Sequence, residues 1–152
     1  MTKSQNRSVK INSGSIVPTD TVRFIRPIDE DERARIVERY GEDAAGFNIS
    51  IQFADKSTKL AVQTLDDVRD QGIALVNIGA NRHVVAANIR QADPFTKDDA
   101  EKLSSELGYT LNQTFRSRVE TLAGTLLSSA TPDQLMQRRS KALNGASAKP
   151  TR

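Results

Sequence analysis

Few side chains in this 152-residue sequence could carry out chemistry. His83 is the only histidine, and the chain has no cysteine, which excludes a thiolate nucleophile, a disulfide and a cysteine-ligated metal site. The sequence places no nucleophile beside His83, and a histidine that follows a hairpin turn is expected to face solvent. The glycines do not have the spacing of a phosphate-binding loop. These features predict no catalytic residue.

Carboxylates are the second group that could do chemistry. Adjacent acids occur at Asp66–Asp67 and Asp98–Asp99, and an acidic run covers Asp29–Glu32. Each group lies at the predicted start of a helix, where the positive end of the helix dipole favours negative charge. A metal site or a glycosidase-like pair of acids is the alternative, but no other residue selects it. We therefore expect no enzymatic activity, no cofactor and no metal.

A possible nucleic-acid motif lies in Thr96–Ser129, where a helix, a glycine break and a second helix are predicted. This order of elements is that of a helix-turn-helix. Amide side chains can pair with adenine edges and arginine with guanine. On the second helix these roles would fall to Asn112, Gln113, Arg116 and Ser117. Cations nearer the C-terminus could hold phosphates, namely Arg138, Arg139, Lys141, Lys149 and Arg152.

The same predicted second helix also carries an apolar stripe. Its residues are spaced four, four, three and four apart, and they are Leu111, Phe115, Val119, Leu122 and Leu126. This spacing is close to a heptad seam and favours packing against the sheet or a second subunit over base reading. Self-association through the stripe is therefore the alternative role of this segment.

Charge is unevenly distributed along the chain. Residues 1–28 carry five Lys/Arg and one Asp, 29–109 carry ten Lys/Arg and sixteen acids, and 110–152 carry seven Lys/Arg and two acids. Basic ends suit nucleic acid. They equally suit docking on the acidic middle of a neighbouring copy, so both a polyanion and a second subunit are candidate partners.

Alternating residues predict a β-rich part over 21–95. The expected strands are Thr21–Pro27, Phe47–Phe53, Thr58–Gln63, Ile73–Ile78, His83–Ala87 and Asn88–Ala92. Within them, Val22 and Phe24 should share one side, Leu60 and Val62 should point inward, and the apolar run Ile73–Ile78 should be central. A strand near Ser8–Ile11 could lie within the polar N-terminal arm.

The order strand, turn, strand, short helix, strand, turn, strand resembles the layout of LytTR-type DNA-binding modules, most of all in the run TLDDV…ALVNIGANRHVVAANI. The resemblance implies a DNA-binding module. The run does not contain a diagnostic basic recognition motif, so the resemblance is one of layout and assigns no family.

Helix starts are marked by capping patterns. Asp29 and Glu32 open a helix that should run to Tyr40, and Thr64 opens a short helix that Gly72 ends. The pairs Thr96/Asp99, Thr110/Gln113 and Thr131/Gln134 predict three further helices, the last reaching about Leu143.

Together these patterns predict an α+β protein in which a small, mainly antiparallel sheet precedes a C-terminal bundle of two to three helices, with basic arms at both ends. The expected parts are an arm over 1–20, one domain over 21–143 (β-rich 21–95, helical 96–143) and a basic tail over 144–152.

The leading hypothesis is a non-catalytic nucleic-acid-binding accessory or regulatory protein of plasmid or phage type that acts as a homo-oligomer. The alternative is a structural subunit of a phage, filament or secretion-type assembly, with the arms lacing subunits together. No apolar run approaches the roughly 18 residues of a membrane span, so no membrane partner and a cytoplasmic location are expected, or a place in the virion for the structural alternative.

Overall fold

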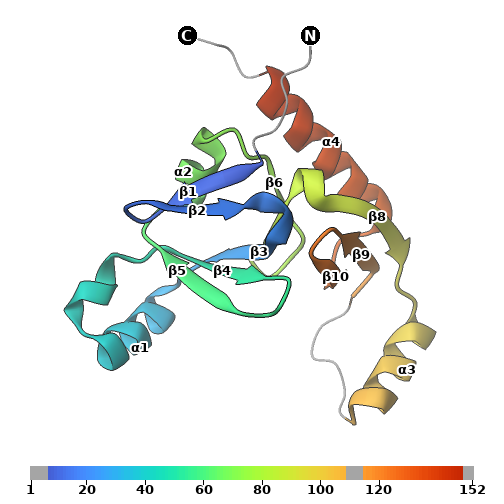
Figure 1. Ribbon diagram of the computed structural model, residues 1–152. Coiled ribbons are helices and arrows are strands. Elements are labelled where there is room, and N and C mark those ends of the chain that lie inside the picture. Colours follow the sequence, from blue (N-terminus) through green and yellow to red (C-terminus); the bar gives the residue numbers. More distant parts are fainter. Residues whose placement is uncertain (1–6, 109–114, 149–152) are drawn as a thin grey trace.

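The computed structural model describes residues 7–108 and 115–148, the side chains of 146–148 excepted. All pairs of described strands are antiparallel and form three sheets (Figure 1). The N-terminal hairpin pairs β1 (Ser8–Ile11) with β2 (Ser15–Pro18). The central sheet has the order β5 (Thr58–Ala61), β4 (Ile49–Phe53), β3 (Val22–Pro27), β7 (His83–Val85) and β6 (Leu75–Asn77). The third sheet has the order β10 (Gly124–Ser128), β9 (Ser117–Thr121) and β8 (Ile89–Pro94).

Four α-helices accompany the sheets in the described part of the chain, which confirms an α+β protein with antiparallel sheets. They are α1 (Glu30–Tyr40), α2 (Leu65–Asp70), α3 (Lys97–Leu107) and α4 (Pro132–Ala148). Three short 3-10 turns are η1 (Thr19–Thr21), η2 (Glu42–Gly46) and η3 (Ala86–Asn88). Among the helices described, none combines the length and apolar character needed to cross a membrane.

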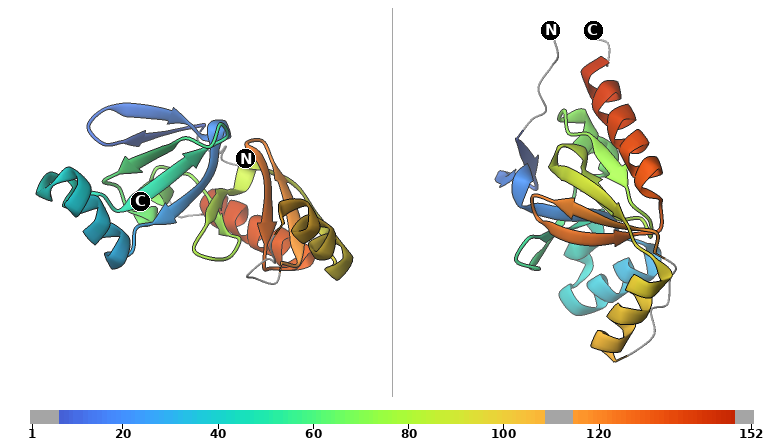
Figure 2. Two further views of the ribbon diagram at one scale, coloured as in Figure 1. Left: turned by 90° about the horizontal axis from the view of Figure 1, so that it is seen from below. Right: turned by 90° about the vertical axis from the view of Figure 1, so that its right-hand side faces the viewer.

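Two hydrophobic cores lie on opposite faces of the central sheet. Leu75 and Val85 belong to the first core, which lies beneath the N-terminal hairpin and α2. Their neighbours Val76 and Val84 belong to the second core, which is shared with the third sheet and α4. Because successive residues of a strand point to opposite faces, β6 and β7 contribute to both cores. Figure 2 shows the N-terminal hairpin and the third sheet on different sides of the central strands.

Because of a β-bulge, β3 contributes side chains to both cores. The pairing of β3 with β4 shifts register between Val22 and Phe24. Val22 and Ile25 are buried in the first core, whereas Phe24 packs against the second. The extra residue of the bulge reverses the alternation, so the prediction that Val22 and Phe24 share one side was wrong.

The capping patterns mark the described helix starts correctly. Reciprocal capping boxes join Thr64 to Asp67 and Thr96 to Asp99, and Thr131 and Gln134 exchange the same two hydrogen bonds at α4. Asp29 caps α1 by accepting from the backbone N–H of Glu32. The Glu32 carboxylate instead makes a bidentate pair with Arg26, at 2.7 Å for each bond. The Thr110/Gln113 pattern lies outside the described residues.

The predicted second helix after Thr110 was wrong over its described part, which forms the β9–β10 hairpin. Along β9 the side chains of Ser117, Val119 and Thr121 are buried while those between them are exposed. Gly124, with φ near 120°, occupies the turn in a conformation that favours glycine. Buried and exposed side chains therefore alternate with the period of two residues that is typical of a strand. The pattern of apolar residues does not show this period, because two of the three inward residues are polar. α3 and α4 consequently lie on either side of a hairpin in the chain.

The two predicted arms are partly structured. Val9, Ile11 and Val17 are buried in the first core, so residues 8–18 form a packed hairpin rather than an arm. The strand expected near Ser8–Ile11 is confirmed. At the other end α4 continues past Leu143 to Ala148. The first six and last four residues lie outside the described part of the chain.

Two further strand predictions need correction. The apolar segment Ile73–Ile78 contains β6, which is an edge strand of the central sheet and not a central one. It is buried because α4 and the third sheet cover it. In β5 the inward residue is Ala61, opposite Ile49, and Val62 is 44% exposed. The predicted inward positions in this strand were thus one residue off.

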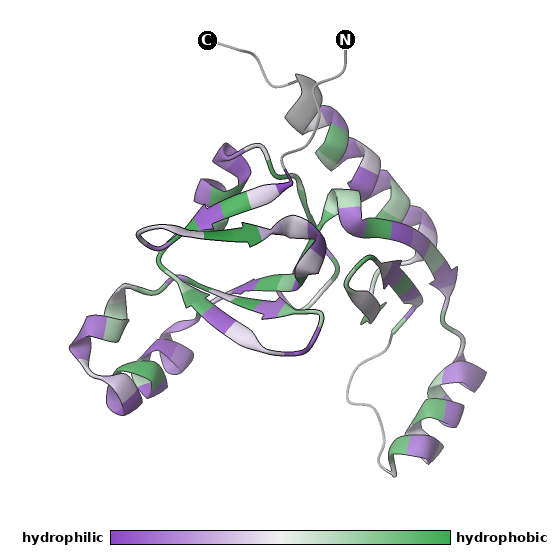
Figure 3. Ribbon diagram, in the orientation of Figure 1, coloured by the Kyte–Doolittle hydropathy of each residue, from purple (hydrophilic) through white to green (hydrophobic). Residues whose placement is uncertain are grey.

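α3 stands away from the body of the protein, as Figure 1 and Figure 3 show. It contains no buried residue, although its apolar and polar positions are segregated as in an amphipathic helix. Leu107, on its last turn, is 44% exposed. Since isolated helices of this length are marginal in water, the capping box at Thr96 and the αL conformation of Gly108 at its C-terminus are important local supports.

Candidate nucleic-acid interface

The structure does not assemble the predicted recognition helix. Asn112 and Gln113 lie outside the described residues. Arg116 is exposed and lies just before β9, with its backbone N–H donating to the carbonyl of Ser128. Ser117 is fully buried, and its hydroxyl donates to the carbonyl of Ala130. Ser117 is therefore a structural residue of the hairpin that cannot face a nucleic acid.

The predicted apolar stripe is divided between the core and the surface. Val119 and Leu126 are buried in the second core of this same chain. Phe115 packs edge-on against Phe95, with ring centroids 6.4 Å apart. Leu122, in the β9–β10 turn, is 53% exposed. Leu111 lies outside the described residues, and the other four do not line one face of a helix.

α4 is the element that brings basic side chains together. Its inner side is apolar: Leu135 is fully buried, and Ala142 and Leu143 pack against the second core. Three cations, Arg138, Arg139 and Lys141, follow within one turn of the helix. Lys149 and Arg152 lie beyond the described residues. Because α4 packs on β6, η3 and β8 through its inner side, its outer side remains accessible.

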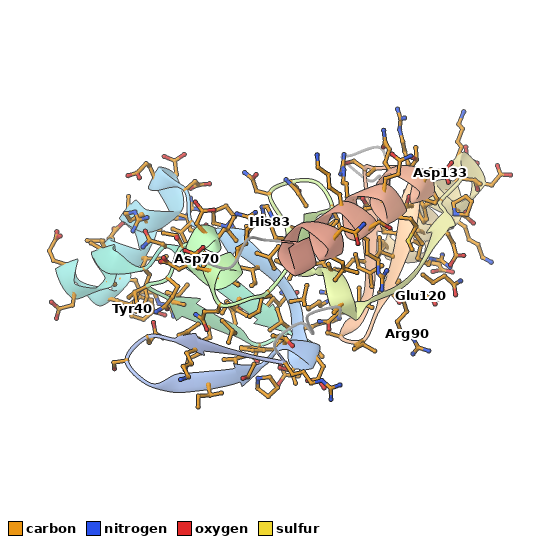
Figure 4. The ribbon with its side chains drawn as sticks, turned by 90° about the horizontal axis from the view of Figure 1, so that it is seen from above. Tyr40, Asp70, His83, Arg90, Glu120 and Asp133 are labelled. Atoms are coloured by element: carbon orange, nitrogen blue, oxygen red, sulfur yellow. The ribbon has the colours of Figure 1, made fainter. Side chains whose placement is uncertain are left out.

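The outer side of α4 carries amide, hydroxyl and basic groups, with one acid at its first turn. At 3.6 residues per turn, Gln137, Arg138, Lys141 and Asn144 lie on one side of the helix, and all four are exposed. The only acid of the helix, Asp133, lies on the same side one turn before Gln137, at the end marked in Figure 4. Over 17 residues the helix is about 25 Å long, long enough to lie along a groove of a duplex. Sequence analysis missed Gln137 and Asn144, because only an extended helix places them with the two cations.

Two arginine side chains of α4 are held against the sheets by hydrogen bonds from their guanidinium groups to backbone carbonyls. Arg138 donates one N–H to the carbonyl of Asn77 at 2.9 Å, and Arg139 donates Nε–H to the carbonyl of Ile89 at 3.3 Å. A guanidinium has five N–H donors, so each retains donors for another acceptor. The arginines of α4 are therefore held in position without being neutralised.

Ion pairs are confined to the other half of the described structure. They join Arg26 to Glu32, Arg33 to Glu30 and Arg69 to Asp66, around α1 and α2. Within the described residues, none of the cations of α4 has a carboxylate within ion-pair distance. The positive charge of α4 is consequently available to a partner.

No family model matches the chain, no curated protein matches its sequence, and no solved structure matches its fold. The elements of the run compared with LytTR-type modules are β4, β5, α2, β6, β7 and β8, but β8 belongs to the third sheet and not to the sheet of the other four strands.

His83 does not face solvent as predicted. It lies near the middle of the molecule (Figure 4), is only 8% exposed, and is paired in register with Ile25 and Asn77. Its Nδ1 is buried without a hydrogen-bond partner in the described structure. Burial, followed by the nearby positive charge of Arg69, lowers the pKa of His83. The imidazole is therefore held neutral in a packed position.

Acidic residues and the grooves of the described structure were the remaining candidates for a metal or ligand site. They contain no cluster of three or more His, Cys, Asp or Glu side chains that could hold a metal. A shallow groove between α1 and α2 is lined by Arg33, Asn48 and Arg69. Its arginines are already engaged, since Arg33 donates to the carbonyls of Ala45 and Phe47 and Arg69 pairs with Asp66.

Proposed function

We propose that this protein is a non-catalytic nucleic-acid-binding protein and that the outer side of α4 is its contact surface. The observation that carries the proposal is the row of Gln137, Arg138, Lys141 and Asn144, all exposed on one side of a single helix whose one acid on that side, Asp133, is confined to the first turn. Arginine and lysine bind phosphates and guanine, and amides pair with adenine.

The chemistry of this row favours a nucleic acid over an acidic protein. A surface for acidic peptides needs cations alone, whereas amides interspersed with cations can also contact base edges. The major groove of B-DNA, about 12 Å wide, admits a helix. In this arrangement Arg138 and Lys141 hold phosphates, and Gln137 and Asn144 lie next to them toward the bases.

The experiment that tests the proposal is a fluorescence-polarisation titration of labelled duplex DNA with the full chain at 50, 100 and 200 mM salt. Because neutralised phosphates release counterions, log K should fall linearly with log salt, by roughly 0.9 per phosphate contacted. Two to four contacts predict a slope between about −2 and −4. Absence of binding to any duplex or single strand at low salt and micromolar protein would refute the function.

A structural subunit is the second candidate, and one observation favours it. α3 has no buried residue and stands away from the body, so its apolar side is free to meet another subunit. Light scattering at high protein concentration tests this alternative. A strict monomer with a protease-sensitive α3 would exclude it.

A further inference from the structure

Two arginines meet at the junction between the central sheet and the third sheet. Arg23, on β3, donates to Oε1 of Gln52 at 2.8 Å and to the carbonyl of Thr125 at 3.1 Å. Arg82, the residue before β7, donates to the carbonyl of Leu127 at 2.6 Å. Alternate residues of a strand direct their carbonyls to the same edge, about 7 Å apart. The two guanidiniums therefore lie side by side along the outer edge of β10.

This pair is unfavourable for the fold as it stands. Neither arginine has an ion-pair partner in the part of the chain that the structure describes. Burial and then the positive charge of Arg23 lower the pKa of Arg82. Arg82 also lies over the ring of Phe24, at 5.9 Å from its centroid, a cation–π contact that offsets only part of this cost. Two neighbouring cations without a counterion repel each other at a cost to stability.

The exposed backbone groups at the edge of β10 can be hydrogen-bonded without positive charge. At two other strand edges of this protein, neutral amide side chains make such hydrogen bonds. Asn12 accepts from the N–H of Val62 and donates to the carbonyl of Leu60, which closes the edge of β5. Gln71 accepts from the N–H of Lys10 and donates to its carbonyl, beside β1. Two adjacent arginines at the edge of β10 therefore need an explanation other than hydrogen bonding to the exposed backbone groups of this strand.

The pair has donors to spare. Arg23 uses its two terminal nitrogens in the bonds already described, which leaves Nε–H unused. Gly124 lies beside this nitrogen: a Cβ there would be 3.7 Å from Nε, and φ near 120° disfavours any other residue. Arg82 makes one short bond and a long one of 3.5 Å from Nε to the carbonyl of Gly79. Both side chains are only partly exposed, so an acceptor that reaches them is partly desolvated.

We propose that Arg23 and Arg82 together bind one tetrahedral oxyanion of the phosphate class at this junction. Two guanidinium forks can each donate to oxygens on different sides of a tetrahedral dianion, and such charge-assisted bonds are strong. Arg82 ends the turn that starts after Asn77, the residue whose carbonyl holds Arg138 of α4. The source of the phosphate is either a nucleic-acid backbone, which rests on the proposed function, or a free phosphate compound.

The test uses NMR of the arginine Nε–Hε groups in the full-length wild-type chain, so it does not depend on a variant that folds. Inorganic phosphate is titrated against sodium chloride at matched ionic strength. Phosphate, and not chloride, should shift the Arg23 and Arg82 signals together and saturably. In Arg23→Gln and in Arg82→Gln the phosphate affinity should fall about tenfold, the loss of one charged hydrogen-bonding partner. Arg35→Gln, an exposed arginine of α1, is the matched control and should bind as wild type does.

A second titration with duplex DNA identifies the source. If duplex moves the same two signals and phosphate competes with it, the pair binds the nucleic-acid backbone. If phosphate binds while no duplex does, the oxyanion site stands and the proposed function fails. If duplex binds but leaves both signals in place, and phosphate shifts neither, the oxyanion proposal is overturned while the proposal for α4 survives.

Discussion

Gly79 allows a sharp test of the turn that supports both cationic surfaces. It opens the turn that ends at Arg82, and its φ is near 113°. A Cβ built on Gly79 would lie 2.5 Å from Oγ of Ser129, closer than real contacts allow, and 3.6 Å from Cβ of the same residue. Gly79→Ala therefore meets two independent obstacles, an unfavourable backbone conformation and a collision with one hydroxyl.

The two costs can be separated by magnitude. An L-residue held in a sparsely populated region of φ/ψ space costs about 1–3 kcal/mol. Displacing the Ser129 side chain from its rotamer adds roughly 0.5–1.5 kcal/mol. Gly79→Ala should therefore lower the free energy of unfolding by about 2–4 kcal/mol. For a chain of this size that corresponds to a fall in Tm of several degrees to about 15 °C.

Urea denaturation followed by circular dichroism measures the effect. In the Ser129→Ala background the Cβ–Oγ collision is absent, so the cost of Gly79→Ala should be smaller by about 1 kcal/mol. Gly145→Ala in α4, where nothing lies within 4 Å and φ is not positive, is the control and should be neutral or slightly stabilising. A Gly79→Ala variant within about 0.5 kcal/mol of wild type would refute the geometry of this turn.

Three further outcomes are expected. The unfolded chain takes up a proton on its histidine near pH 6.5, but the lowered pKa of His83 keeps the folded state unprotonated there, so stability should fall as pH drops below about 6.5. Urea melts at pH 7.5 and 5.0 should show a smaller loss in His83→Phe, and an equal loss would contradict the assignment. Leu126→Ala should cost about 2–5 kcal/mol and Leu122→Ala less than about 0.5 kcal/mol; similar costs would favour the rejected helix. Asn12→Ala frees the edge of β5, so light scattering should detect more concentration-dependent association than in wild type; a variant that associates no more than wild type would mean that Asn12 does not protect this edge.

The helix starts were predictable from sequence because they depend on local chemistry. The reciprocal bonds at Thr64, Thr96 and Thr131 join residues three positions apart, so a pattern in the sequence is enough to identify them. The central strand β4 was predictable for a similar reason, since Ile49 and Ile51 alternate strictly with polar residues.

The β9–β10 hairpin was not predictable in this way because its inward polar residues depend on distant partners. Ser128 is buried because its hydroxyl donates to the carbonyl of Ile78, and Ser117 because it donates to Ala130. Without those partners a serine counts as a surface residue. The remaining apolar residues then show a helical spacing by coincidence. Gly124 was the one local signal against a continuous helix.

The position of β6 depends on long-range contacts too. Its continuous apolar sequence is typical of a central strand, since both faces are buried. The structure instead buries an edge strand by laying α4 along it, with Arg138 closing the carbonyl of Asn77. The sequence shows that β6 is buried on both faces but not which element covers it.

The candidate interface was predictable only in part. The basic residues of α4 were identified from sequence, but the second helix of the expected helix-turn-helix does not form over its described part, which is the β9–β10 hairpin. Gln137 and Asn144 join Arg138 and Lys141 only because α4 extends to Ala148 and its inner side packs on the second core. The orientation of the helix, which is a tertiary property, decides which residues face a partner.

The sheet edges bear on how the protein would assemble. Side chains of Asn12, Gln71, Arg23 and Arg82 occupy backbone groups at the edges of β5, β1 and β10. Since an unoccupied edge is the usual route to strand addition, these three edges are less available for pairing with a strand of another subunit. The exposed side of α3 is the first place to look for a contact between subunits.

The most direct test of the central claim compares two variants that lose the same charge. Arg138→Gln with Lys141→Gln removes two cations from the outer side of α4, and Arg35→Gln with Lys102→Gln removes two exposed cations from α1 and α3. Duplex affinity is measured at 100 mM salt after circular dichroism has shown both variants to be folded. The α4 variant should bind at least about tenfold more weakly than wild type, with a salt slope smaller by about two, while the control keeps its affinity. Equal weakening of both variants would show that net charge, and not the outer side of α4, accounts for binding.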